Sequence, residues 1–397
     1  MAEQRYEITK ATRDKYKVFA VSDVEMKKFA NVSVELFGYL KDAKKIDFKI
    51  YFRVDAELVE IITPKNFAAE LVDLVIHSRN KEYTNLDICV ERKDYSKFEH
   101  LIHHIREKKI ERLLARDPNL DRKTIMTFAD LSGASQMIVR GGINKTVAAR
   151  AREAATKLID GLMDCHVAIG TLSRMILIDA TLYDHSAAVS MMSGIIAKLL
   201  MDKTPEEAEK IARAGLYHDV GKTCVPGKLL NKPGRFTPEE FEVIKTHTTL
   251  GFEELKKATA AGATIEKEVA LVALEHHEKF FGGGYPQNKK GRFEEHANGI
   301  HEYARIVSIA DVYSALLMKR VYKEAYDQAH SLAVMRNLAP TDYDPNIWSK
   351  FEQSVTQSIN FYTAMERATA RDKGRILMLD DAGQLQEINA KKNKSAS

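Results

Sequence analysis

The feature that most constrains this chain is an ordered series of histidines and aspartates inside a long stretch of helical periodicity, from about residue 165 to 365. The series reads His185, His218, Asp219, His247, His276, His277 and Asp311. These residues fall in five segments that we predict as helices, or at the ends of those segments. A lone histidine on an apolar helix usually packs in the core or lies on the surface. Seven such groups in one helical region instead predict metal ligands.

The number and type of these groups indicate which metals fit. Imidazole and carboxylate ligands suit Fe, Mn or Zn far better than Ca or Mg. An ion that keeps a catalytic position open normally takes fewer than six or seven ligands from the protein. The series therefore favours two divalent transition-metal ions, with Fe or Mn preferred and Zn as a further choice.

Two further features lie close to this series in the sequence. Lys222 follows His218 by four residues, which predicts that both side chains point from one face of a helix. A lysine beside a metal pair is a natural partner for a phosphate oxygen. The run Gly282–Pro286 contains three glycines, which leave the backbone free for close approach to a ligand. Taken alone, this run is better explained as a loop that connects two helices.

Composition excludes several classes of protein. Of the 397 residues, 45% are hydrophobic and 29% are charged, which is ordinary for a globular protein. The net charge of +4 is too small for this length to predict a nucleic-acid partner. Three scattered cysteines favour a reducing compartment. The most apolar stretch, Ala188–Met201, is interrupted by polar residues, and the N-terminus shows no signal peptide. We therefore expect a cytoplasmic protein with no membrane partner.

Residues 1–115 are predicted to form a small α+β domain. Alternating apolar residues at 32–36, 46–50 and 86–90 predict half-buried strands. From Asp94 to Arg116 the apolar spacing becomes helical. Three histidines lie on this segment, at His100, His103 and His104. We interpret them as a solvated face, because no carboxylate or cysteine completes a metal site.

Three further segments complete the predicted organisation. Residues 116–164 are predicted as a helical linker, and residues 165–370 as the all-α domain that carries the ligand series. Residues 371–397 are predicted as a C-terminal β-hairpin, formed by 376–379 and 385–388, and a disordered polar tail.

The segment YHDVGKTCVPGKLLNKPGRFTPEEFEVIKTHTTLG, followed by HHEKFFGGGYP, resembles the HD-GYP family. These proteins are bacterial cyclic-di-GMP phosphodiesterases within the HD superfamily of metal-dependent phosphohydrolases. The resemblance covers roughly residues 180–355 and continues through IADVYSALLMKRVYKEA. It implies an all-α HD-type helical bundle that holds a metal centre.

The resemblance also implies roles for individual residues. The seven residues of the histidine and aspartate series would ligate metal, with Asp219 bridging two ions and acting in catalysis beside Lys222. Positions that contact substrate in the family correspond to Lys222, Gly284, Tyr285, Arg320 and Lys323. A metal-bridging hydroxide would attack phosphorus and yield the linear dinucleotide, GMP or both.

The chain departs from the family pattern at several positions. Some family members ligate a third metal with a Glu at the position of Thr181, so we expect two ions here. Phe281 stands where the family usually has Asp, and Gln287 where it often has Arg. These departures affect nucleotide specificity and turnover more than metal binding.

Two alternatives to cyclic-di-GMP hydrolysis remain. The first is a non-catalytic signalling effector that binds cyclic-di-GMP or metal. The second is an HD-type phosphohydrolase for another nucleotide. By analogy with the family, the N-terminal domain would be regulatory, the helices around 150–180 would form a homodimer surface, and a signalling protein would be a partner.

Overall fold

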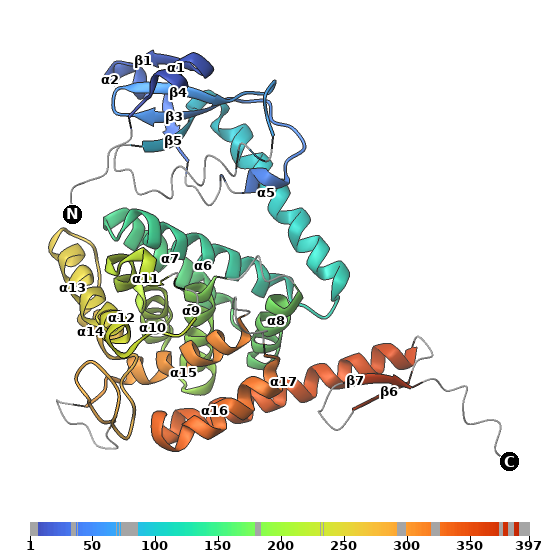
Figure 1. Cartoon of the computed structure of the whole chain (residues 1–397). Coiled ribbons are helices and arrows are strands. Elements are labelled where there is room, and N and C mark those ends of the chain that lie inside the picture. Colours follow the sequence, from blue (N-terminus) through green and yellow to red (C-terminus); the bar gives the residue numbers. More distant parts are fainter. Residues whose placement is uncertain are drawn as a thin grey trace. The chain divides into compact units, whose positions relative to one another are not determined.

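The computed structural model describes residues 7–32, 37, 39–68, 70, 72, 86–178, 184–230, 232, 234–291, 299–318, 326–372, 376–379 and 385–388. The chain divides into two compact units, residues 1–112 and 113–397 (Figure 1). The first unit contains a small antiparallel sheet, and the second is mostly helical. Among the described residues, no helix has the length and apolar character needed to cross a membrane.

The first unit is built on a five-stranded sheet with the strand order β1-β4-β3-β5-β2, in which every pair is antiparallel. The strands are β1 (Lys17–Ala20), β2 (Phe29–Asn31), β3 (Ile50–Val54), β4 (Glu57–Ile62) and β5 (Leu86–Glu91). Among the described residues of this unit, short helical segments accompany them at α1 (Lys10–Lys15), α2 (Asp23–Met26) and the 3₁₀ turn η1 (Tyr39–Asp42). This unit therefore has the predicted α+β character.

The predicted strands meet different outcomes. The alternation at 86–90 corresponds to β5. The alternation at 46–50 precedes β3, which begins only at Ile50. Ile46 and Phe48 are nevertheless buried in the core of this unit, so their spacing reflects burial rather than strand pairing. Residues 33–36 lie outside the described residues.

A long helix, α5 (Arg92–Arg116), follows the sheet. Its apolar side chains are buried, and the Phe98 ring packs edge-on against Phe48 with 5.8 Å between centroids. His100, His103 and His104 are exposed, which confirms their interpretation as a solvated face.

The second unit is a bundle of helices, some of them short. They are α6 (Arg122–Gly141), α7 (Lys145–Gly161), α8 (Cys165–Ile178), α9 (His185–Ile195), α10 (Pro205–Tyr217), α11 (Gly227–Leu230), α12 (Pro238–Lys245), α13 (His247–Ala260), α14 (Lys267–Glu275), α15 (Glu302–Leu317), α16 (Gln328–Asp342) and α17 (Pro345–Asp372). A π-helical turn, η3 (Ile196–Leu200), continues α9, and a 3₁₀ turn, η4 (Val220–Cys224), follows α10. Two strands, β6 (Ile376–Leu379) and β7 (Leu385–Ile388), pair antiparallel near the C-terminus.

Helix α9 forms the centre of this bundle. Every residue from Ala187 to Ile195 is buried, and α6, α7, α10 and α15 all pack against it (Figure 1). Glycine allows the closest of these approaches, since a Cβ on Gly215 of α10 would lie 2.8 Å from Cα of Ser190. The helices α6 and α7, which cover most of residues 116–164, thus pack within the second unit.

The starts of α10 and α12 follow from the same sequence pattern, Thr-Pro-Glu-Glu. In each case the threonine side chain accepts from the backbone N–H of the second glutamate, whose carboxylate accepts from the threonine N–H. The proline occupies the first helical position, where its missing N–H costs nothing. These capping boxes fix where two helices next to the ligand series begin.

A buried ion-pair network joins α10 to α14. The Arg213 side chain is fully buried, and its guanidinium donates to Glu209 of the same helix at 2.7 Å. It also donates to Glu266 at 2.7 Å and to the carbonyl oxygen of Thr264 at 3.2 Å. Glu266 is the N-cap residue of α14. Arg213 therefore positions the start of α14 on α10.

Replacing Arg213 with Met should destabilise the second unit by about 3–5 kcal/mol, because the buried carboxylate of Glu209 would lose its partner. Urea unfolding followed by circular dichroism measures this change. The matched control is Arg150→Met, which breaks an exposed pair with Glu153 and should leave the unfolding midpoint unchanged. Equal midpoints for Arg213→Met and the unsubstituted protein would contradict the role of the network.

Candidate metal centre

The structure brings all seven residues of the predicted ligand series together. His185 is the first residue of α9, and His247 is the first residue of α13. His218 and His276 cap the C-terminal ends of α10 and α14, and His277 follows directly. Asp311 lies inside α15, and Asp219 precedes η4. Most of the ligand set therefore comes from helix ends, where a side chain points past its own helix into the space between neighbours.

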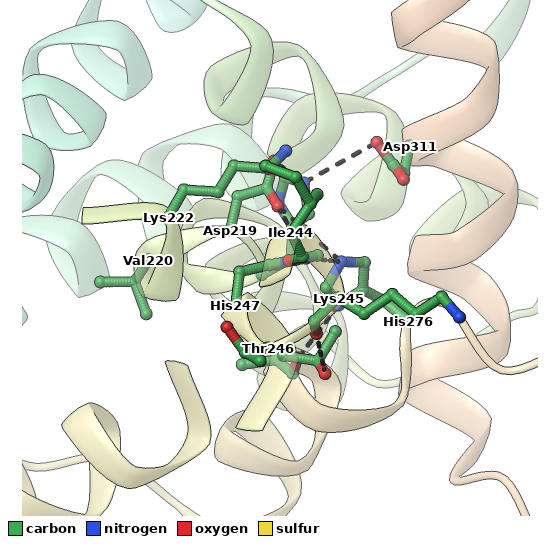
Figure 2. A network of polar contacts seen from close by, with 12 residues as sticks. Asp219, Val220, Lys222, Ile244, Lys245, Thr246, His247, His276 and Asp311 are labelled. Carbon is green, nitrogen blue, oxygen red and sulfur yellow. Dashed lines mark hydrogen bonds and ion pairs between the residues drawn. The ribbon is translucent and has the colours of Figure 1, made fainter. Parts of the chain in front are cut away.

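Asp219 lies in the middle of the cluster. Its Oδ1 is 3.4 Å from Nε2 of His247 and 3.9 Å from Nε2 of His276. Its Oδ2 is 3.1 Å from Nε2 of His218 and 3.9 Å from Nε2 of His185. Figure 2 shows Asp219, His247 and His276 directed toward one another. The two oxygens of one carboxylate thus face two different sets of imidazoles.

These contacts divide the ligands into groups that could each hold an ion. One group is Asp219 with three histidines, His247, His276 and His277. A second is Asp219 with His185 and His218. Asp311 joins a third group with His218 and His276, and its Oδ1 lies 3.0 Å from Nε2 of His185. Asp219 is shared by the first two groups.

Backbone carbonyl groups set the orientation of three imidazoles. Nδ1 of His218 lies 2.8 Å from the carbonyl oxygen of Gly215, and Nδ1 of His247 lies 2.7 Å from that of Ile244. Nδ1 of His276 lies 3.0 Å from the carbonyl oxygen of Val272. A carbonyl oxygen only accepts, so each Nδ1 carries the proton and each Nε2 presents its lone pair to the cluster. This is the tautomer that a metal ligand requires.

Burial keeps most of these histidines neutral. It lowers the pKa of His277 to about 4, and it lowers the pKa of His276 well below its ordinary value, with the neighbouring histidines adding to the effect. The pKa of His247 is also lowered by burial. Burial alone would lower the pKa of His218, but the adjacent Asp219 carboxylate raises it instead.

Both carboxylates stay ionised despite burial. Burial would raise the pKa of Asp219, but the charges of His218 and Lys222 hold it well below its ordinary value. In the same way, His185 overcomes burial and holds the pKa of Asp311 below its usual range. The cluster thus combines two ionised carboxylates with imidazoles that burial keeps neutral at His247, His276 and His277, a donor set that suits a transition-metal site.

Unsatisfied polar atoms support the same interpretation. Within the described part of the chain, Nε2 of His218 and Oδ1 of Asp219 are buried and have no hydrogen-bond partner. Leaving such atoms unpaired in a protein interior costs free energy. A cation among the imidazoles and carboxylates would satisfy both atoms, so these residues fit a bound divalent metal.

Lys222 reaches the cluster by a different route from the predicted one. Helix α10 ends at Tyr217, so Lys222 and His218 do not share a helical face. Lys222 instead lies in the 3₁₀ turn η4, where residues three apart eclipse one another, and its ammonium contacts the Asp219 carboxylate. About 40% of its side chain is exposed, so Lys222 lies at the boundary between the cluster and solvent.

The glycine-rich loop packs against the histidine pair. A Cβ on Gly284 would lie 2.4 Å from the backbone nitrogen of Lys279, so only glycine fits here. The backbone N–H of Tyr285 donates to the carbonyl oxygen of His277 at 3.2 Å, and the two rings lie 4.8 Å apart. Phe280 is buried, whereas Phe281 is 48% exposed. Of the other predicted phosphate contacts, Arg320 and Lys323 lie outside the described residues.

Sequence reasoning missed two buried glutamates that flank the histidine pair. Glu278 accepts from the backbone N–H groups of Gln287 at 2.6 Å and Lys289 at 2.9 Å. Glu275 accepts from the Lys289 ammonium at 2.6 Å and from the backbone N–H of His301 at 2.7 Å. Through these hydrogen bonds, both carboxylates hold the segment that follows the glycine loop next to His276 and His277. The sequence feature that could have revealed their role is the position of these two glutamates, directly before His276 and directly after His277, at the end of an apolar run.

Comparisons with known proteins agree with this site. Residues 171–347 match the family model of the HD domain. A cyclic di-GMP phosphodiesterase from Thermotoga maritima is 33% identical over 181 residues, which cover 45% of this chain and 46% of that protein. The cyclic di-GMP phosphodiesterase response regulator RpfG from Xanthomonas campestris is 36% identical over 157 residues, which cover 40% and 39% of the two chains. The chain thus spans less than half the length of these relatives.

A solved structure shares the fold over a longer part of the chain. It is Bd1817, an HDG"Y"P protein from Bdellovibrio bacteriovorus, with a TM-score of 0.52. The match covers 83% of this chain and 99% of that one at 17% identity. At this identity the likeness shows a common fold.

Gly221 provides a test of how the centre is assembled. A Cβ at this position would lie 1.9 Å from the carbonyl oxygen of His247 and 2.4 Å from the backbone nitrogen of Gly251. Gly221→Ala should therefore push η4 away from α13, separate Asp219 from His247 and lower the metal content of the purified protein. Metal analysis by mass spectrometry measures the effect. The control is Gly133→Ala, where a Cβ meets nothing within 4 Å. Unchanged metal content in a folded Gly221→Ala protein would contradict this assembly.

Proposed function

Because residues 171–347 match the family model of the HD domain, we propose that the protein is a metal-dependent phosphodiesterase that hydrolyses cyclic-di-GMP to the linear dinucleotide, to GMP, or to both. The observation that carries the proposal is the Asp219 carboxylate shared between two groups of histidines. The names of the relatives support the substrate class.

The donor set suits Fe, Mn and Zn alike. We propose two ions, with Fe or Mn as the first choice and Zn as a further one. His247, His276 and His277 would hold one ion, while His185 and His218 would hold the other, with Asp219 between them. Asp311 would complete the second position through its place beside His185. When bound, such ions lower the pKa of water and polarise phosphoryl oxygens.

Lys222 is the proposed cationic partner of the substrate. Its ammonium contacts Asp219 at the solvent-facing edge of the cluster, where a phosphodiester would approach. There it would donate hydrogen bonds to the phosphoryl oxygens and stabilise the negative charge that grows on them. The same ammonium would give a proton to the leaving oxygen and recover one from solvent. Gly284, Tyr285, Arg320 and Lys323 remain proposed substrate contacts.

Asp219→Asn and His276→Ala should each lose metal and cyclic-di-GMP hydrolysis together, because each change removes an inward-facing ligand. Metal analysis and chromatography of the nucleotide products, both under anaerobic and reducing conditions, measure the two properties. His100→Ala serves as the control, since that histidine is exposed on α5. A variant that loses its metal but still hydrolyses the dinucleotide would rule out the proposed site.

Lys222→Met should retain metal and lower kcat by about a hundredfold, because a charge-stabilising donor is lost while the ligands stay. Lys222→Arg should recover part of the rate.

If the unsubstituted, metal-loaded protein binds cyclic-di-GMP without forming product, the effector function replaces the enzymatic one. Cleavage of other nucleotides with none of cyclic-di-GMP would favour the broader HD-type phosphohydrolase.

A further inference from the structure

A cluster of two aromatic rings and one lysine lies beside the metal ligands. It consists of Phe241 and Lys245 on α12 and Tyr285 of the glycine loop. The Phe241 and Tyr285 rings meet edge to face, with 6.2 Å between centroids. The Lys245 ammonium lies 5.1 Å from the centroid of Phe241 and 5.7 Å from that of Tyr285. We call these three residues the aromatic–lysine cluster.

Tyr285 connects this cluster to the metal ligands. Its ring lies 4.8 Å from that of His277 and 6.4 Å from that of His247. Lys245 is the last residue of α12 and precedes His247 by two residues (Figure 2). A group bound on the aromatic–lysine cluster would therefore lie next to a phosphate held at the metal centre.

The cluster is accessible from solvent. Phe241 is 42% exposed, although burying a phenylalanine side chain would stabilise the folded protein. Lys245 keeps 27% of its side chain exposed, and within the described part of the chain its ion pair is with the exposed Glu242, at 2.6 Å. Part of the Phe241 ring and part of the Lys245 side chain are thus both exposed to solvent.

Helix α13 contains the same Phe, Glu and Lys spacing as α12, but among the described residues it lacks a neighbouring tyrosine from the glycine loop. Phe252, Glu253 and Lys256 on α13 have the same spacing as Phe241, Glu242 and Lys245 on α12. Lys256 lies 5.3 Å from the Phe252 ring and 3.1 Å from the Glu253 carboxylate. In the described part of the chain, however, no tyrosine or histidine ring packs on Phe252. Local sequence thus accounts for the Phe–Lys contact, and only the fold brings one copy to the metal ligands.

We propose that the aromatic–lysine cluster is a subsite that binds a guanine base of the substrate and selects it against adenine. The proposal deepens the proposed function and rests on it. Phe241 stacks on the purine, as aromatic side chains do with unpaired bases. Lys245 donates to O6 and N7, which are both acceptors in guanine. Adenine presents an amino group in place of O6, and this donor faces the lysine unfavourably.

The experiment uses the full-length, metal-loaded protein with cyclic-di-GMP and cyclic-di-AMP. Dissociation constants come from calorimetry under conditions that prevent turnover, and KM and kcat come from product chromatography. Phe241→Leu should weaken the binding of both dinucleotides by roughly tenfold, because stacking is lost whichever base is present. Lys245→Met should reduce the preference for cyclic-di-GMP over cyclic-di-AMP by roughly tenfold, and Lys245→Arg should restore it. Metal content should stay unchanged, and the losses should appear in the dissociation constants and in KM.

The matched controls are Phe252→Leu and Lys256→Met, which make the same changes in the same local pattern on α13. Both should bind like the unsubstituted protein. Equal affinities in Phe241→Leu and the unsubstituted protein, or an equal base preference in Lys245→Met, would overturn the subsite while leaving the proposed function intact. If the unsubstituted protein neither binds nor cleaves a cyclic dinucleotide, the proposed function fails and the subsite fails with it.

Discussion

The hydrogen bonds between histidine Nδ1 atoms and backbone carbonyl oxygens are the constraint on which the metal centre depends. His218 and His276 close the C-terminal ends of their helices, and each Nδ1 contacts a carbonyl oxygen near the end of its own helix. His247 begins its helix and uses a carbonyl oxygen at the end of the preceding one. Each bond fixes a ring plane and a tautomer at once. The geometry of the site is thereby set by where helices begin and end.

The order of the ligands could be predicted from the sequence, because residue type and helical periodicity are local properties. His100, His103 and His104 could be set apart for the same reason, since no further ligand type accompanies them. The position of Lys222 could not be predicted, because α10 ends at Tyr217 and Lys222 lies in the following turn, η4, where Gly221 packs against the backbone of α13. The roles of Glu275 and Glu278 depend on a loop that approaches only in the folded chain.

In the N-terminal unit, too, the sequence predicted only part of the secondary structure. Period two at 86–90 predicts β5, whereas Ile46 and Phe48 alternate because both are buried, without belonging to a strand. Whether a segment pairs as a strand depends on its packing against the other strands of the sheet, and a short apolar run in the sequence does not determine this pairing. The domain boundaries at 115, 164 and 370, the homodimer surface around 150–180 and the regulatory role of the first unit stay predictions.

The ion pairs of Arg213 affect the free energy with which the site binds a metal ion. Arg213 joins α10 to Glu266, the N-cap residue of α14. The ligand His276 lies at the opposite end of α14, and His218 follows the last residue of α10. The helix pair is thus held in register by the protein's own charges, away from the ligands. An ion entering such a preorganised site does not have to order the chain. Its binding free energy then appears as affinity and selectivity rather than as folding free energy, in contrast to small domains that fold only around their metal.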